Sequence, residues 1–98
     1  MKVLFHPAAD AELDEAIEYY ESQESGLGRV FAEAVRDAVQ RALMHPRAWS
    51  LLDGELRRSL VARFPYGVIY AESKDGLYIL AVMHLHRSPD YWRARRPY

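Results

Sequence analysis

The stretch YGVIYAESKDGLYILAVMHLH, residues 66–86, decides the fold of this 98-residue chain. Valine, isoleucine and tyrosine, which favour strands, dominate both halves, and residues 73–76 between them end in Asp-Gly, a common hairpin turn. The stretch therefore predicts two antiparallel strands, at residues 66–72 and 77–86. Residues 77–85 are apolar on both faces, which predicts a central strand covered by helices on one side and by another segment on the other.

Two amphipathic helices are expected before this hairpin, after a short first strand at residues 3–5. Apolar side chains recur at helical spacing through residues 8–24 and again from Leu27 to the His45-Pro46 pair. The break between the two stripes is short and contains two glycines, so the helices should lie side by side and bury their stripes against each other or on a common sheet.

The remaining elements complete a small α+β domain. Residues 56–64 alternate in a way that predicts a strand, with Arg57 on one side and Arg58 on the other, and Pro65 closes it. Residues 88–96 carry a helix-start pattern, which predicts a short C-terminal helix or turn. The expected order is β-α-α-β-β-β in one domain, residues 1–98, with a mainly antiparallel sheet packed on a helical hairpin.

Charge is polarised along the chain although the net charge is only −1. Residues 1–46 contain four basic residues against nine acidic ones, whereas residues 47–98 contain nine basic residues against five acidic ones. Eight of those nine late cations are arginine, which makes forked contacts with phosphate or carboxylate. The arginines therefore indicate either a binding surface for anions or a set of solvated strand edges.

Several function classes are disfavoured by composition. The chain has no cysteine, which excludes disulfides and thiolate metal sites. The N-terminus carries only a three-residue apolar run, too short for an export leader or for the roughly 20 apolar residues of a spanning helix. The four histidines lack the spacing of metal ligands, and there is no glycine-rich phosphate loop. We expect a cytoplasmic protein without cofactor, metal or membrane contact.

Across nearly the whole chain, this order and several local motifs resemble the RelE/ParE toxins of type II toxin–antitoxin systems, also known as plasmid stabilisation proteins. The resemblance implies a growth inhibitor that forms a hetero-oligomer with a cognate antitoxin, whose C-terminal segment wraps the toxin and blocks it. The matching stretches are Phe5-His6-Pro7-Ala8-Ala9 with Glu12-Leu13, Tyr19-Tyr20-Glu21, Gly26-Leu27-Gly28 with Phe31, Pro46, Arg57-Arg58, Phe64-Pro65-Tyr66 with Ile69-Tyr70, and residues 81–92.

The resemblance leaves two molecular targets open. RelE-like members cleave messenger RNA on the ribosome, whereas ParE-like members inhibit DNA gyrase without a cleavage site. Cleavage needs a base, an acid and cations on the phosphate. The candidates for these roles are His84 and His86 as acid or base, Tyr91 as proton donor or stacking ring, and Arg58, Arg63 and Arg87 as phosphate ligands. Arg87 has an alternative role as an internal clamp on the C-terminal tail.

The charge balance favours the gyrase inhibitor. A protein that sits within ribosomal RNA usually has a clear positive excess, whereas this sequence has a pI of about 6.4. Lys2 and Lys74 are the only lysines, so the sheet lysines of RelE-like nucleases are absent. The endoribonuclease is kept as the alternative, and an inactive relic or stand-alone binding domain as a third hypothesis.

The antitoxin is expected on the helical hairpin and the sheet arginines. Antitoxin segments dock an amphipathic helix or strand in an apolar groove, with charge pairs at its rim. The hairpin residues could instead be intramolecular core. The expected contact residues are Leu13, Ile17, Tyr20, Phe31 and Val35, with Arg57, Arg58 and Arg63.

Overall fold

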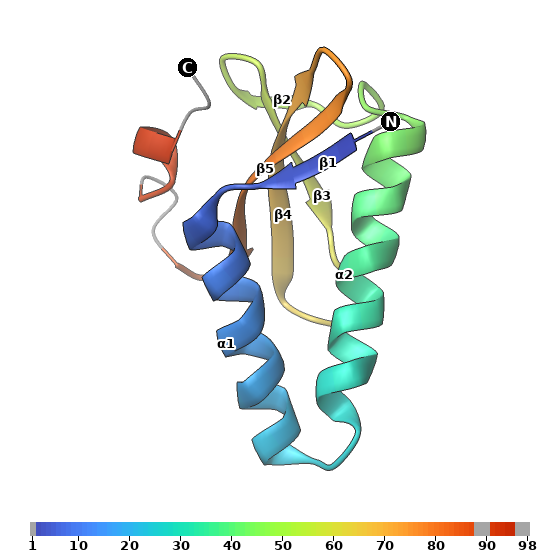
Figure 1. Cartoon of the computed structure of the whole chain (residues 1–98), viewed down its shortest axis with the longest axis vertical. Helices are drawn as coiled ribbons and strands as arrows, with labels where there is room; N and C mark the ends of the chain where they lie inside the picture. The colour runs from blue at the N-terminus through green and yellow to red at the C-terminus, as the bar shows by residue number, and fades with distance from the viewer. Residues whose placement is uncertain (1, 88–90, 96–98) are drawn as a thin grey trace.

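The computed structural model describes residues 2–87 and 91–95, which form two helices over one face of a five-stranded sheet (Figure 1). The elements are β1 (Lys2–Phe5), α1 (Pro7–Gln23), α2 (Leu27–Met44), β2 (Leu51–Asp53), β3 (Leu56–Leu60), β4 (Tyr66–Ser73), β5 (Gly76–His84) and the 3-10 helix η1 (Arg93–Arg95). The strand order is β1-β5-β4-β3-β2, and only the β1–β5 pair is parallel. The predicted α+β class and mainly antiparallel sheet are confirmed.

The β2–β3 region differs from the sequence expectation in two ways. The stretch between Pro46 and residue 56, for which the sequence predicted no strand, includes β2, an edge strand of three residues that is too short to show an alternating pattern. The predicted strand at residues 56–64 ends at Leu60, because the chain then turns tightly and the backbone N–H of Val61 donates to the carbonyl of Tyr66. Within this turn Arg63 adopts a left-handed φ of 69°, so the strand prediction was wrong for its last four residues.

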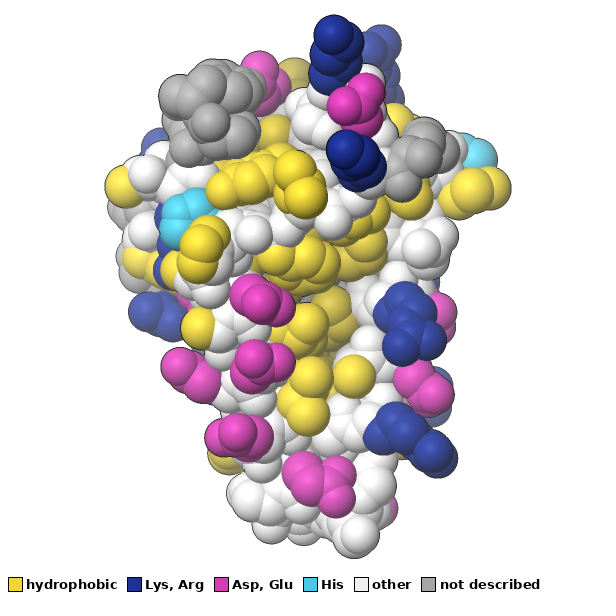
Figure 2. Space-filling model, in the orientation of Figure 1, with side chains coloured by type: hydrophobic (Ala, Val, Ile, Leu, Met, Phe, Trp, Pro, Cys, Tyr) yellow, Lys and Arg dark blue, Asp and Glu magenta, His cyan; other side chains and the backbone are white. Residues whose placement is uncertain are grey.

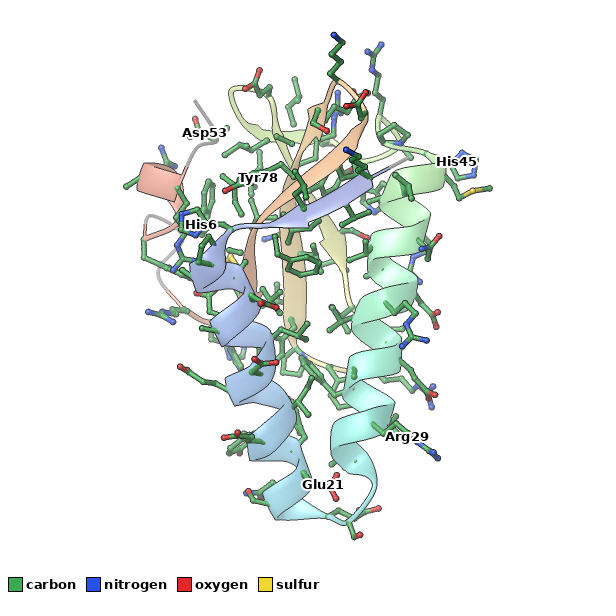
Figure 3. All side chains as sticks on the ribbon, viewed as in Figure 1. His6, Glu21, Arg29, His45, Asp53 and Tyr78 are labelled. Atoms are coloured by element: carbon green, nitrogen blue, oxygen red, sulfur yellow. The ribbon has the colours of Figure 1, made fainter. Side chains whose placement is uncertain are left out.

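Glu21 lies at the tip of the helical hairpin (Figure 3), where it contacts the start of α2. The Glu21 carboxylate accepts hydrogen bonds from the backbone N–H groups of Gly26 and Gly28 at 3.0–3.1 Å, which satisfies free donors at the start of α2. A Cβ on Gly28 would lie 2.8 Å from the Ile17 carbonyl oxygen. Glycine at this position therefore permits the close approach of α2 to α1.

Hydrophobic clusters cover both faces of the central strands. On the helix side, Phe31 and Val35 of α2 are buried against Val68 and Ile79 of the sheet. On the opposite face, the C-terminal segment places Trp92 among strand residues such as Leu80, and both side chains are 0 % exposed. The predicted central strand with two covered faces is confirmed. The Ser88, Pro89, Asp90 and Arg96 part of the predicted tail helix lies outside the described residues.

Replacing Trp92 by alanine is expected to lower the free energy of unfolding by about 3 to 5 kcal/mol, because it removes the largest buried side chain on this face. Urea denaturation followed by far-UV circular dichroism measures the change. The control is Leu4→Ala, at a side chain that is 58 % exposed, where a loss within about 0.5 kcal/mol is expected. Equal losses in the two variants would contradict the placement of Trp92.

Candidate functional site

A polar cleft of about 240 Å³ opens between α1 and the ends of β4 and β5. It contains His84 and Arg87, two of the residues that the sequence singled out for catalysis, together with carboxylates and tyrosines from α1 and β4. His86 lies beside this cleft, with its ring centroid 5.2 Å from that of His84. The lining residues are Glu12, Glu15, Ala16, Tyr19, Tyr66, Val82, His84 and Arg87.

His84 is held at the last position of β5 by its neighbours. Its Nδ1 accepts a hydrogen bond of 3.1 Å from the backbone N–H of His86, and its ring meets the Tyr66 ring edge-on at 5.2 Å. A neutral imidazole that accepts at Nδ1 carries its proton on Nε2. The imidazole of His84 is therefore held in place by one hydrogen bond and one ring contact.

Arg87 and Arg95 both lie against the ring of Tyr91. The guanidinium carbon of Arg87 is 3.9 Å from the ring centroid and that of Arg95 is 4.9 Å away, distances typical of cation–π contacts. Burial, with a smaller contribution from the charge of Glu12, raises the pKa of Tyr91 to about 12. The phenol is therefore protonated near neutral pH. Through its contact with the Tyr91 ring, Arg87 clamps the C-terminal segment.

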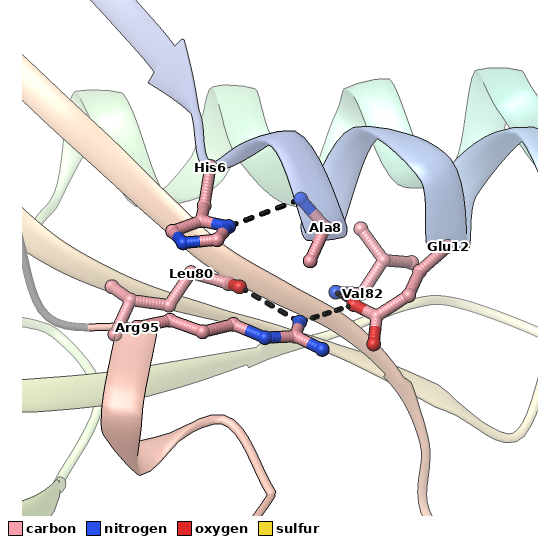
Figure 4. A network of polar contacts seen from close by, with 6 residues as sticks. All are labelled: His6, Ala8, Glu12, Leu80, Val82 and Arg95. Carbon is pink, nitrogen blue, oxygen red and sulfur yellow. Dashed lines mark hydrogen bonds and ion pairs between the residues drawn. The ribbon is translucent and has the colours of Figure 1, made fainter.

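Glu12 links α1 to β5 and to the C-terminal segment (Figure 4). Its Oε1 accepts from the backbone N–H of Val82 at 3.1 Å and from Nη1 of Arg95 at 2.9 Å. The same Arg95 nitrogen donates to the carbonyl of Leu80 at 3.2 Å. Strand β1 pairs with β5 only as far as Ile79. Beyond that point, Glu12 satisfies the backbone N–H of Val82 and Arg95 satisfies the carbonyl of Leu80.

The other arginines predicted for the site lie away from the cleft. Arg57 donates from its guanidinium to the carbonyl of Trp49 and so has an internal role. Arg58 lines a hollow with Trp49 and Leu60, whereas Arg63 is exposed in the β3–β4 turn. The structure therefore brings together His84, His86, Arg87 and Tyr91. Arg58 and Arg63 do not line the cleft.

An apolar groove of about 330 Å³ runs between the two helices next to β1. Figure 2 shows hydrophobic side chains in the hollow between the helices, with acidic side chains along α1 and cations along α2. Of the residues expected to contact the antitoxin, Leu13 and Val35 line this groove. Ile17, Tyr20 and Phe31 pack into the cluster between helices and sheet. The groove is lined by Val3, Phe5, Leu13, Ala32, Val35, Arg36, Val39 and Gln40.

The family model for the ParE toxin of the type II toxin–antitoxin system parDE matches residues 3–89. The chain belongs to the ParE toxin family. A solved structure titled "Chromosomal ParDE TA system from P. aeruginosa" superposes on this ParE-family chain with a TM-score of 0.64 and 17 % identity, covering 88 % of this chain and 97 % of the other. At that identity the likeness shows the shared fold. A search of curated proteins finds no match.

Two general features of this ParE-family toxin are also observed. In the described part of the chain, neither helix is long and apolar enough to cross a bilayer. Within residues 2–87 and 91–95, no three histidine or acidic side chains converge as they would around a metal ion.

Sequence reasoning missed Glu12 and Arg95 as partners. Glu12 falls between Ala9 and Ala16 on the stripe of α1 that turns toward the sheet, and a charged residue on such a stripe was the available signal. The partner could not be inferred, because Arg95 is 83 residues away in the sequence. Glu15, Tyr19 and Tyr66 were not assigned to the cleft for the same reason.

Replacing Glu12 by alanine is expected to destabilise the protein by about 3 to 5 kcal/mol, because Arg95 would stay largely buried without its counter-ion. Limited proteolysis should also cut the C-terminal segment faster. The matched control is Glu15→Ala, which removes an exposed carboxylate from the same helix and the same cleft. If both variants showed wild-type stability and cleavage, the proposed role of the Glu12–Arg95 pair would be wrong.

Proposed function

We propose that this toxin arrests growth by binding and inhibiting DNA gyrase, and that it does not cut RNA. The match to the ParE toxin model over residues 3–89 carries the proposal. The chemistry of the cleft supports it. The pKa of Tyr91 is raised to about 12, which makes its phenol a weaker acid than a free tyrosine and so a poorer proton donor to a leaving oxygen. Nδ1 of His84 already accepts a hydrogen bond from the backbone N–H of His86, so this nitrogen is engaged within the chain and does not face a 2′-hydroxyl unpaired.

The cleft is also poorly suited to a phosphate. Its wall includes the exposed carboxylate of Glu15, which would repel a phosphodiester, whereas the charge of Glu12 is already paired with Arg95. Arg87 is held on the Tyr91 ring, and Arg58 lines a different hollow. The cations that would have to stabilise a phosphorane are therefore not gathered at one point. This arrangement supports an inhibitor that acts by binding a protein.

A ribosome-dependent endoribonuclease is the second candidate function. The observation in its favour is that the rings of His84 and His86 lie 5.2 Å apart, with Arg87 lining the same cleft as His84. Histidine pairs of this kind can divide the roles of acid and base. The two functions differ in how they depend on these three side chains.

Expression without the antitoxin in a heterologous bacterium distinguishes them. Wild type, His84→Ala and Arg87→Ala are all expected to stop growth with intact messenger RNA and altered plasmid supercoiling, because binding to gyrase does not use the cleft. Northern blots and plasmid topoisomer gels provide the measurements. Cleaved transcripts that disappear in the folded His84→Ala protein would establish the nuclease, and unimpaired growth with wild type would indicate an inactive relic.

The antitoxin is proposed to neutralise the toxin by laying an amphipathic segment in the groove between α1 and α2. Helix α1 carries six acidic residues and no basic ones, whereas Arg36 of α2 lines the groove from the other side. A segment with an apolar stripe, basic residues toward α1 and a carboxylate toward Arg36 would match this pattern. Leu13 and Val35 keep the antitoxin role expected from the sequence, now as parts of the groove wall.

Filling the groove tests this assignment. Ala32→Trp places a large side chain in the groove and is expected to weaken antitoxin binding by at least about tenfold, because the antitoxin's apolar stripe loses its space. Isothermal titration calorimetry with the cognate antitoxin gives the affinity. Ala11→Trp is the control, at an exposed alanine of α1 outside the groove. Unchanged affinity in the folded Ala32→Trp protein would place the antitoxin elsewhere.

A further inference from the structure

A second apolar surface lies at the β2–β3 edge of the sheet. It surrounds a hollow of about 220 Å³ lined by Trp49, Ser50, Leu51, Leu52, Arg58 and Leu60. Leu51, Leu52 and Leu60 are 56 %, 41 % and 49 % exposed. Six large hydrophobic side chains are this exposed in the described part of the chain, and three of them meet at this one hollow. Such clustering is typical of an interaction surface.

Arg58 gives this surface, the β2–β3 patch, a cation. The residue pairs with Ile69 of β4, and both belong to the sheet face that the helices do not cover. Gly67 makes room for Arg58, because a Cβ on Gly67 would lie 2.9 Å from its Cγ and Cδ atoms. Arg58 is half-buried, and among the described residues no hydrogen bond or ion pair satisfies its guanidinium. A partly desolvated cation of this kind favours binding of an external anion.

The anion can come from a protein carboxylate or from a nucleic-acid phosphate, and the leucines favour the protein. Surfaces that bind single strands combine cations with several aromatic rings on which bases stack, whereas this hollow has one aromatic ring, Trp49, and three leucines. Apolar groups surrounding an arginine are typical of the buried centre of protein–protein interfaces. Leu60 and Leu52 would gain free energy from contact with apolar side chains and none from a phosphate backbone.

We infer that the β2–β3 patch is the surface that binds the target protein, through a carboxylate on Arg58 and apolar side chains on the surrounding leucines. This inference rests on the proposed inhibition of gyrase. The patch belongs to the sheet face opposite the helical groove, so the antitoxin segment and the target bind different faces. The groove itself does not contact the target, so an antitoxin that neutralises the toxin must also reach the patch, where Arg58 is one of the sheet arginines expected to contact it.

Purified gyrase in a plasmid supercoiling assay tests the inference. The variants are Arg58→Glu, which reverses the charge, and Leu60→Glu, which charges the apolar rim. Each is expected to raise the toxin concentration for half-inhibition at least about tenfold, as loss of a central interface residue does. Leu4→Glu is the matched control, because Leu4 is 58 % exposed on β1 at the opposite edge of the sheet. Far-UV circular dichroism and urea denaturation check that each variant is folded.

The outcomes separate the inference from the proposed function. If wild type and Leu4→Glu inhibit gyrase and both patch variants do so equally well, the patch is not the target surface although the function stands. If wild type does not inhibit gyrase, both are overturned. A fluorescence anisotropy titration with duplex DNA alone tests whether the patch binds nucleic acid and not a protein. DNA binding by wild type that is lost in Arg58→Glu and kept in Leu60→Glu would make the patch a nucleic-acid surface and overturn the inference.

Discussion

The Glu12–Arg95 ion pair is the interaction on which the two-sided architecture depends. Strand β1 leaves β5 at Ile79, and the Glu12 carboxylate and the Arg95 guanidinium then take over the backbone groups of Val82 and Leu80. One carboxylate thus joins α1, the central strand and the C-terminal segment. Both side chains are mostly buried, so the loss of either would leave the charge of the other buried without a counter-ion. The pair also holds the segment that covers the second face of the sheet.

The C-terminal segment covers only part of the second face of the sheet, and the part that it leaves uncovered forms one of the surfaces of the toxin. Trp92 closes the face over β4 and β5, but the β2–β3 edge keeps exposed leucines around Arg58. On the helix side, the groove beside β1 lies between the acidic helix α1 and Arg36 of α2. The polarised charge of the sequence therefore corresponds to different surfaces of the fold. An antitoxin and a target protein that differ in charge can each find a matching face.

Periodicity was sufficient for the helices α1 and α2, whereas β4 and β5 followed from their content of Val, Ile and Tyr and from the Asp-Gly turn between them. It failed for β2, where three residues cannot show an alternation, and for the end of β3, where Arg63 turns left-handed. The proximity of His84, His86, Arg87 and Tyr91 followed from their closeness in the sequence. The cleft partners on α1 and the split of the arginines between surfaces depend on tertiary packing, which local sequence does not encode.

Hydrogen exchange on the toxin, free and bound to gyrase, tests the separation of faces most directly. The β2 edge strand has only three residues and should exchange quickly in the free protein, so protection there will be easily detected. Binding of the target at the β2–β3 patch predicts that gyrase slows exchange in β2 and β3 and leaves the β1 edge and the exposed turns of α1 and α2 unchanged. Protection confined to the helical hairpin, with β2 exchanging as in the free toxin, would contradict it.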